Sequence, residues 1–133
     1  MNAIHIFLKR KLPEFCIQKG TLITAYNSPG SPDRPWAKPD DPKSLEDQKL
    51  GELAKKYNKT LAQVLIRYQL DCGHTIVISK SVTKSRIAQN SEVFDFKLSL
   101  EDIAYIDTFD CNGRICPMLG TEASSYYPFH IPL

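Results

Sequence analysis

Only two runs in this 133-residue chain have the composition of buried β-strands, and each stands between helical segments. Residues 21–26 (TLITAY) are rich in β-branched and apolar side chains, and residues 76–78 (IVI) are wholly apolar. Residues 3–8 supply a third, weaker candidate. Strands that alternate with helices predict parallel βα units of an α/β fold. A parallel sheet of two or three strands leaves unpaired edges and an uncovered face, so the pattern favours part of a larger architecture.

Helix signals occur in five segments. The first covers about residues 9–18, where Pro13 must lie in the first turn. Two helices follow within residues 44–70; Asn58 ends the first of them, and Thr60 with Gln63 forms a capping box that opens the second. Two more helices begin at the predicted N-caps Thr83 and Ser99. The side chains expected to face inward are Leu50, Leu53, Ala54, Tyr57, Leu61, Val64, Leu65, Tyr68, Leu100, Ile103 and Ile106.

Two segments lack helix or strand periodicity. Residues 27–42 (NSPGSPDRPWAKPDDP) contain five prolines in sixteen residues. This length and composition favour an ordered functional loop over a passive linker, because prolines lower the entropy cost of ordering and Trp36 provides an anchor. The tail at 111–133 shows no helical or strand period.

Composition narrows the class of protein. A hydrophobic fraction of 42% with 24% charged residues argues against disorder, and a net charge of +2 does not favour nucleic acid as a partner. No apolar run approaches the length of a membrane span, and the start of the chain does not resemble a signal peptide. The four cysteines show no C-x-x-C spacing, which predicts free thiols, no metal site and a cytoplasmic location.

The stretch VISKSVTKSRIAQN (77–90) is the strongest binding signal. A strand end that leads into a helix N-terminus gathers free backbone N–H groups, which suit an anion. The side chains of Lys80, Ser81, Thr83 and Arg86 favour a phosphate. The competing interpretation from the residues alone is a solvated basic helix start.

Five stretches occur in the order typical of one known family: TAYNSPGSPDRPWAKPDDP, KTLAQVLIRYQL, ISKSVTKSRIAQN, VFDFKLS and YPFH. They resemble the aldo-keto reductases, and the aldose reductase-like branch most of all. The resemblance runs from about residue 19 to 133, whereas residues 1–18 match weakly. It implies a single partial domain over 1–133: the last two or three βα units of a (β/α)8 TIM barrel, an extra helix and the C-terminal tail at 111–133. A complete barrel needs roughly 250 residues, so one copy of this chain cannot close one.

The resemblance also implies a cofactor, NADPH/NADP+, and residues that bind it. Lys80 and Arg86 would bind the 2′-phosphate, Arg86 also lying on the adenine face, and Tyr26 would stack on the nicotinamide. The full implied set is Tyr26, Ser31, Asp33, Lys80, Ser81, Val82, Thr83, Arg86, Gln89 and Asn90, with Gln89 and Asn90 at the adenine edge. Ser31 belongs to the loop at 27–42, which would fold over the pyrophosphate, and Asp33 would lock that loop by pairing with Lys80. Trp36 and Cys116 would line the substrate pocket; hydrophobic packing is the alternative for both, and a plain turn residue is the alternative for Asp33.

The implied activity is the reduction of a carbonyl substrate, an aldehyde or ketone, by hydride transfer from NADPH. The family's catalytic tyrosine, lysine, aspartate and histidine belong to the first half of the barrel, so we expect no catalytic residue here. The chain alone is therefore expected to be inactive. The alternative hypothesis is a non-catalytic nucleotide-binding or protein-interaction fragment, with self-association through the open sheet edge.

Overall fold

Two short parallel strands and five α-helices form the part of the chain that the structure describes. The computed structural model describes residues 11–26, 48–73, 76–109 and 119–127. The element order is α1 Lys11–Gln18, β1 Thr24–Tyr26, α2 Gln48–Lys56, α3 Leu61–Asp71, β2 Ile76–Ile78, α4 Lys84–Ser91, α5 Leu100–Asp107 and the 3₁₀ helix Leu119–Thr121. The expected strand at 3–8 and the proline-rich loop at 27–42 lie outside the described residues.

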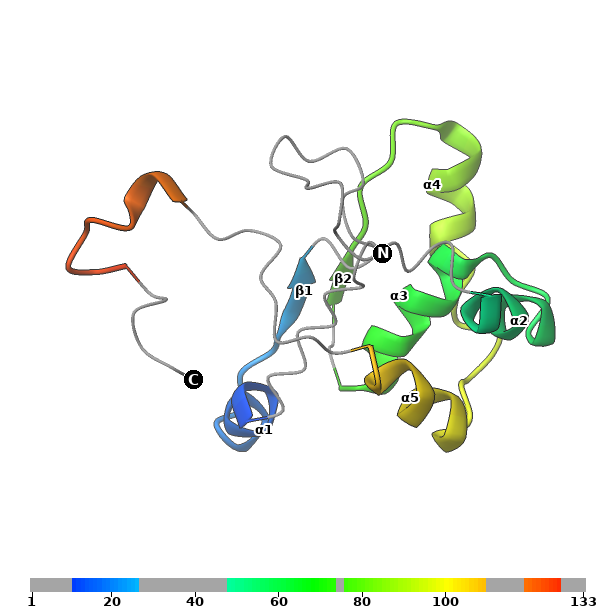
Figure 1. The fold of residues 1–133 in the computed structure, drawn as a ribbon, viewed down its shortest axis with the longest axis horizontal. Coiled ribbons are helices and arrows are strands. Elements are labelled where there is room, and N and C mark those ends of the chain that lie inside the picture. Colours follow the sequence, from blue (N-terminus) through cyan, green and yellow to red (C-terminus); the bar gives the residue numbers. More distant parts are fainter. Residues whose placement is uncertain (1–10, 27–47, 74–75, 110–118, 128–133) are drawn as a thin grey trace.

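The strands β1 and β2 lie side by side although about fifty residues separate them in the sequence. They pair in parallel, with Thr24 opposite Ile76 and Tyr26 opposite Ile78. The helices α2 and α3 lie in the connection between them, as parallel strands require a crossover. Figure 1 shows α2, α3, α4 and α5 on one side of the two strands and α1 near the start of β1. The predicted parallel βα units are therefore confirmed.

The expectation that both strands are fully buried is wrong. Ile76 is 44% exposed and Ile78 51% exposed, while Leu22 before β1 is 67% exposed. Among the strand residues whose burial the structure describes, which leaves out Tyr26, Ala25 alone is buried, at 9%. The reason is architectural: the sheet formed by the described residues has only two strands, so too few neighbours cover its faces.

The helix ends follow the local sequence. After α1, Gly20 takes a φ of 65° and the Thr21 N–H donates to the Cys16 carbonyl at 2.8 Å. After α2, Asn58 takes a φ of 52° and the Lys59 N–H donates to the Ala54 carbonyl at 2.9 Å. Both are Schellman endings, in which a left-handed residue lets the chain satisfy the last helical carbonyls. Asn58 therefore ends its helix as predicted.

The core forms where α2, α3 and α5 meet. It is built from Leu50, Leu53, Ala54, Val64, Leu65, Tyr68, Leu98 and Ile106. The prediction that Leu100 faces inward is wrong, because this side chain is 85% exposed. At 3.6 residues per turn, Leu100 and Ile106 lie about 120° apart around the helix, so a three-residue repeat does not keep them on one face.

The last described segment, 119–127, lies apart from the helices, beyond the two strands (Figure 1). It begins with the short 3₁₀ helix Leu119–Thr121. The sequence of the tail shows no helical or strand period. One turn is too short to show a period in the sequence.

Candidate functional site

The N-terminus of α4 receives no capping hydrogen bond from the side chain of its N-cap residue. Thr83 occupies the N-cap position with extended backbone, but its side chain makes no capping hydrogen bond. At α3 and α5, by contrast, the side chains of Thr60 and Ser99 accept from the backbone of Gln63 and Asp102. The first N–H groups of a helix have no partner within the helix. Those of α4 therefore remain available to a ligand acceptor.

Positive charge surrounds this helix start. Lys80 precedes α4, and Lys84 and Arg86 lie in its first turn; all three side chains are exposed. The first turn of α4 contains no acidic residue. The macrodipole adds partial positive charge at the same end. An anion with several acceptor oxygens, such as a phosphate monoester, fits this combination of backbone donors and cations.

The structure brings together five of the predicted cofactor residues in and directly after the connection from β2 to α4. Lys80, Ser81, Val82 and Thr83 lie in that connection, and Arg86 lies in the first turn of α4 directly after it. The Thr83 N–H donates to the Ser81 hydroxyl at 3.2 Å, which folds this connection back on itself. Val82 is 85% exposed, so its side chain is not part of the core.

The other predicted residues fall into two groups. Gln89 and Asn90 lie in the last turn of α4, and the Asn90 side-chain nitrogen donates to the Ser79 hydroxyl at 3.2 Å. Tyr26 is the last residue of β1, directly opposite Ile78 at the end of β2. The remaining predicted residues, Ser31, Asp33, Trp36 and Cys116, lie outside the described residues.

A row of polar side chains along α3 holds the segment that follows α4. Lys59, Gln63, Arg67 and Asp71 recur every four residues, and we call them the α3 row. Within α3, successive members of the row lie about 40° apart around the helix, so each is adjacent to the next. Lys59 lies just before the N-cap Thr60. Apart from Thr60, the hydrogen-bonded partners of the row that lie outside it fall within residues 89–98, and most of these partners are backbone atoms.

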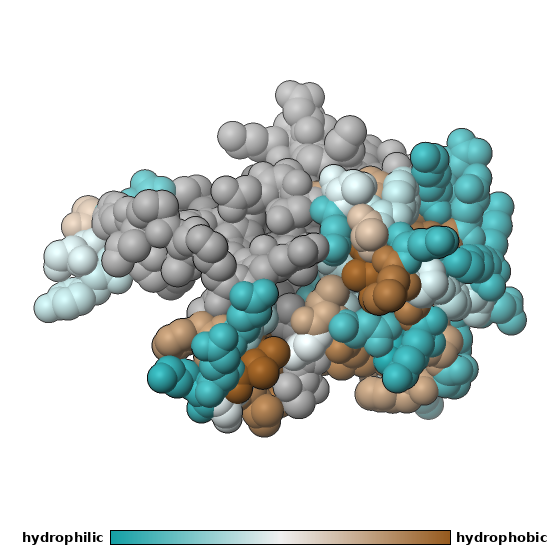
Figure 2. Space-filling view, turned by 90° about the horizontal axis from the view of Figure 1, so that it is seen from below, coloured by the Kyte–Doolittle hydropathy of each residue, from teal (hydrophilic) through white to brown (hydrophobic). Residues whose placement is uncertain are grey.

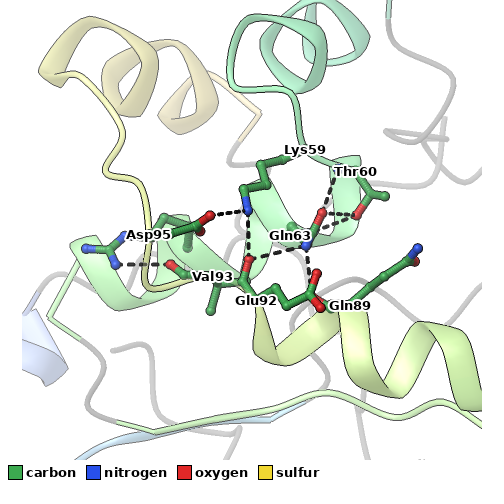
Figure 3. Close-up of polar contacts among 8 residues, drawn as sticks. Lys59, Thr60, Gln63, Gln89, Glu92, Val93 and Asp95 are labelled. Atoms are coloured by element: carbon green, nitrogen blue, oxygen red, sulfur yellow. Dashed lines mark hydrogen bonds and ion pairs between the residues drawn. The ribbon is translucent and has the colours of Figure 1, made fainter.

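The N-terminal half of the α3 row is shown in Figure 3. The Gln63 side-chain nitrogen donates to the carbonyls of Gln89 at 2.9 Å and Glu92 at 3.2 Å. The Lys59 ammonium donates to the Glu92 carbonyl at 3.2 Å and pairs with the Asp95 carboxylate at 2.7 Å.

The C-terminal half of the row is an ion pair that also contacts backbone. The Arg67 guanidinium pairs with Asp71 and donates to the Val93 carbonyl at 3.2 Å, and Asp71 accepts from the Leu98 N–H at 3.1 Å. Burial raises the pKa of Asp71, but the hydrogen bonds from Arg67 and the Leu98 N–H outweigh burial and lower it. This carboxylate therefore stays charged and keeps both contacts.

A second polar cluster joins α2 to α5. The buried carboxylate of Asp102 accepts hydrogen bonds from the Lys56 ammonium at 2.7 Å, the Tyr57 hydroxyl at 2.5 Å and the Ser99 hydroxyl at 2.7 Å. The Tyr57 hydroxyl in turn accepts from the Ser99 N–H at 3.0 Å. The cluster is satisfied within itself, which indicates a structural role.

Sequence reasoning missed two of these polar roles. Gln63 was predicted as a capping-box residue only, and its second contact with α4 has no local sequence signal, since Gln89 lies 26 residues away. Asp102 stands three residues after the N-cap Ser99, a spacing that indicates capping but not a bond to α2. Both contacts depend on how the helices pack.

Three further observations concern metal-ligating groups, helix length and a surface depression in the described residues. Across residues 11–26, 48–73, 76–109 and 119–127, no group of three or more His, Cys, Asp or Glu side chains is arranged to hold a metal ion. Within the same ranges, no helix is long and apolar enough to cross a membrane. An open depression of about 410 Å³, lined by residues that include Lys55, Asn58 and Gln89, lies beside the C-terminal end of α4 rather than at its basic start.

The fold and the basic helix start together define a parallel α/β protein with exposed cations at a helix N-terminus that follows a strand end. Residues 13–110 match the family model described as "Aldo/keto reductase family". The chain belongs to the aldo/keto reductase family.

Individual relatives agree with this assignment. Aldo-keto reductase family 1 member A1-A of Danio rerio is 48% identical over 83% of this chain and 34% of its own length. Aldo-keto reductase family 1 member A1 of Gallus gallus is 39% identical over 96% of this chain and 42% of its own. The chain thus spans between about a third and two fifths of the length of these curated relatives.

A solved structure supports the fold. The crystal structure of a Bombyx mori aldo-keto reductase in complex with NADP superposes with a TM-score of 0.79 at 35% identity, over 90% of this chain and 39% of that one. The described α/β architecture is therefore part of an aldo-keto reductase barrel, and it does not form a closed barrel by itself.

Proposed function

We propose that this chain carries the part of an NADP(H)-dependent aldo-keto reductase that binds the 2′-phosphate and adenine of the cofactor. The observation that carries the proposal is the open N-terminus of α4, where Thr83 does not cap and Lys80 and Arg86 are exposed. The Bombyx mori relative was solved with NADP, which supports the choice of anion. The free thiol of Cys16 supports the cytoplasmic location we also propose.

Each residue of this segment has a proposed task. Lys80 and Arg86 hold the 2′-phosphate, and Arg86 suits stacking on adenine because its guanidinium is planar and always charged. Ser81 and Thr83 donate hydroxyl or backbone hydrogen bonds. Gln89 and Asn90 face the adenine edge, and Tyr26 stacks on the nicotinamide.

The proposed reaction class is the reduction of an aldehyde or ketone. NADPH, when bound, supplies the hydride for this chemistry. The described residues contribute cofactor binding and no catalytic residue, so we propose that this chain is inactive alone. Within the loop at 27–42, we propose Ser31 and Asp33 as cofactor contacts and Trp36 as a wall of the substrate pocket, together with Cys116 of the tail.

The test is a calorimetric titration of the chain with NADPH, with NADH as the comparator. We expect saturable binding that prefers NADPH. The Arg86→Ala variant should bind NADPH about tenfold or more weakly, because a hydrogen bond to a charged group contributes about 1.5–3 kcal/mol. NADH affinity should change less, since NADH lacks the 2′-phosphate.

The matched control is Lys55→Ala, which also removes one exposed cation but lies on α2. This variant should bind NADPH as the unchanged chain does. Equal losses of NADPH affinity in both variants would mean that the affinity reflects net charge. If the folded chain bound no NADPH, the proposal would be wrong and the alternative, a protein-interaction fragment, would be favoured.

A further inference from the structure

We propose that Gln63 and Ser79 are positioning residues that fix α4 and thereby set how its basic start meets the cofactor. This inference rests on the proposed function above, because it concerns the same site. Neither residue is part of the cofactor-binding set. Each acts through the last turn of α4, Gln63 from α3 and Ser79 from the end of β2.

The helix α4 needs such anchors because it is poorly buried. Among the described residues, none of the eight in α4 belongs to the core. Its one large aliphatic side chain, Ile87, is 55% exposed. In most proteins the packing of an apolar face supplies a helix's stability and position. Polar contacts must therefore contribute an unusually large share of the stability of α4 and of what fixes its position.

The burial and hydrogen bonds of the Gln63 side chain suit this positioning role. Its residue is only 4% exposed, and its side-chain oxygen accepts from the Thr60 N–H at 2.8 Å. The side-chain nitrogen then donates to the Gln89 and Glu92 carbonyls at the C-terminal end of α4. One side chain thus opens α3 and holds the end of α4, and the amide group is well satisfied at both of its polar atoms.

Ser79 holds the neighbouring residue from the strand side. Its hydroxyl accepts from the Asn90 side chain at 3.2 Å, and Ser79 directly follows β2. The two contacts fix Gln89 through its backbone and Asn90 through its side chain. They therefore fix the end of α4 relative to both α3 and the sheet, and a rigid helix transmits that position to Arg86 one turn earlier.

The decisive variant is Gln63→Glu. A glutamate at this position still accepts from Thr60 and keeps the capping box. It loses the donor, however, and directs a carboxylate toward two carbonyl oxygens at the negative end of the α4 dipole. We expect hydrogen exchange of residues 84–91 to become about fivefold faster or more, and the ratio of NADPH to NADH affinity to fall by a similar factor.

The matched control is Thr60→Ala. This variant removes the capping hydroxyl and destabilises α3, but it leaves the Gln63 contact with α4 in place. Exchange should accelerate in the first turn of α3, while exchange of α4 and the affinity ratio remain unchanged. A purely structural effect of Gln63 would instead make the two variants alike.

The Ser79→Ala variant repeats the test from the strand side and remains informative should Gln63→Glu unfold the chain. It should also accelerate exchange of α4 and lower the affinity ratio. Unchanged exchange of residues 84–91 in both folded variants would overturn the inference. Faster exchange in a chain that does not bind NADPH would support the anchoring and overturn the proposed function alone.

Discussion

Asp102 shows how one buried carboxylate can join two helices. Its neighbours are the Lys56 ammonium, 52% exposed on α2, and the hydroxyls of Tyr57 and Ser99. Burial raises the pKa of Asp102, but the hydrogen bonds from Lys56, Tyr57 and Ser99 outweigh burial and lower it to about 2. A carboxylate that prefers the charged form in the folded state links stability to pH.

This linkage gives a prediction with a definite sign. Because the folded pKa lies below the ordinary value of 3.8, the contribution is present above about pH 4 and is lost as pH falls toward 2. Its size is about 2 kcal/mol. We expect Asp102→Asn to lower the free energy of unfolding by about that amount at pH 7, with the difference shrinking in acid; urea unfolding across this pH range measures it.

The control for this prediction is Glu101→Gln, which removes the same charge from the adjacent, exposed position. Its stability should follow that of the unchanged chain at every pH. If Asp102→Asn and the unchanged chain differed equally at pH 7 and pH 2.5, the titration of Asp102 would not be the cause.

At the scale of elements, the end of α2 depends on one left-handed residue. Asn58 has a φ of 52° and an exposed side chain. Asparagine tolerates this conformation better than residues with larger or apolar side chains, and glycine tolerates it best.

We predict that Asn58→Ala lowers the free energy of unfolding by about 1 kcal/mol, because a Cβ without a polar group is strained in this conformation. Asn58→Gly should preserve stability or raise it slightly. Urea unfolding of the two variants side by side measures the difference. Equal stability of the two would place the loss in the asparagine side chain rather than in the backbone conformation.

Features that depend on neighbouring residues could be predicted from the sequence, whereas contacts between residues far apart in the chain could not. The helix stripes, the capping box of Thr60 and the parallel strand order are confirmed, because local periodicity and capping chemistry specify them. The inward orientation of Leu100 was wrong because a three-residue repeat drifts around the helix. The basic start of α4 was visible as a motif, whereas the Gln63 anchor joins residues far apart in sequence and had no local signal.

At the scale of the molecule, apolar surface remains outside the core. Exposed large apolar side chains include Phe15, Ile17, Leu22, Ile76 and Ile78. Figure 2 shows apolar patches beside hydrophilic surface on the face it presents. No third strand from the described residues pairs with the two-stranded sheet, and its isoleucines are exposed. Both features favour contact with another chain.

We predict that the purified chain is marginally stable and self-associates as its concentration rises. Calorimetry should show a broad thermal transition, and sizing chromatography should show an elution volume that decreases with concentration. A sharp, cooperative transition of a strict monomer would contradict both expectations.

The double variant Ile76→Thr/Ile78→Thr tests self-association separately from marginal stability. Threonine keeps the β-branched shape that strands favour, and both side chains are already about half exposed. We expect weaker self-association with little loss of stability. Unchanged association would place the contact on another surface.

The α3 row has a consequence for how this protein can vary. Gln63, Arg67 and Asp71 contact carbonyls or N–H groups of residues 89–98 rather than their side chains. Every amino acid presents the same carbonyl, and all but proline present the same N–H. These three contacts are therefore indifferent to which side chains the path from α4 to α5 carries, apart from proline at position 98, because Asp71 needs that N–H. The buried side chains of Val93 and Leu98 still constrain the path through packing. Mutations can accumulate at the exposed positions of this connection, such as Phe94 and Lys97, while the helices on either side keep their places.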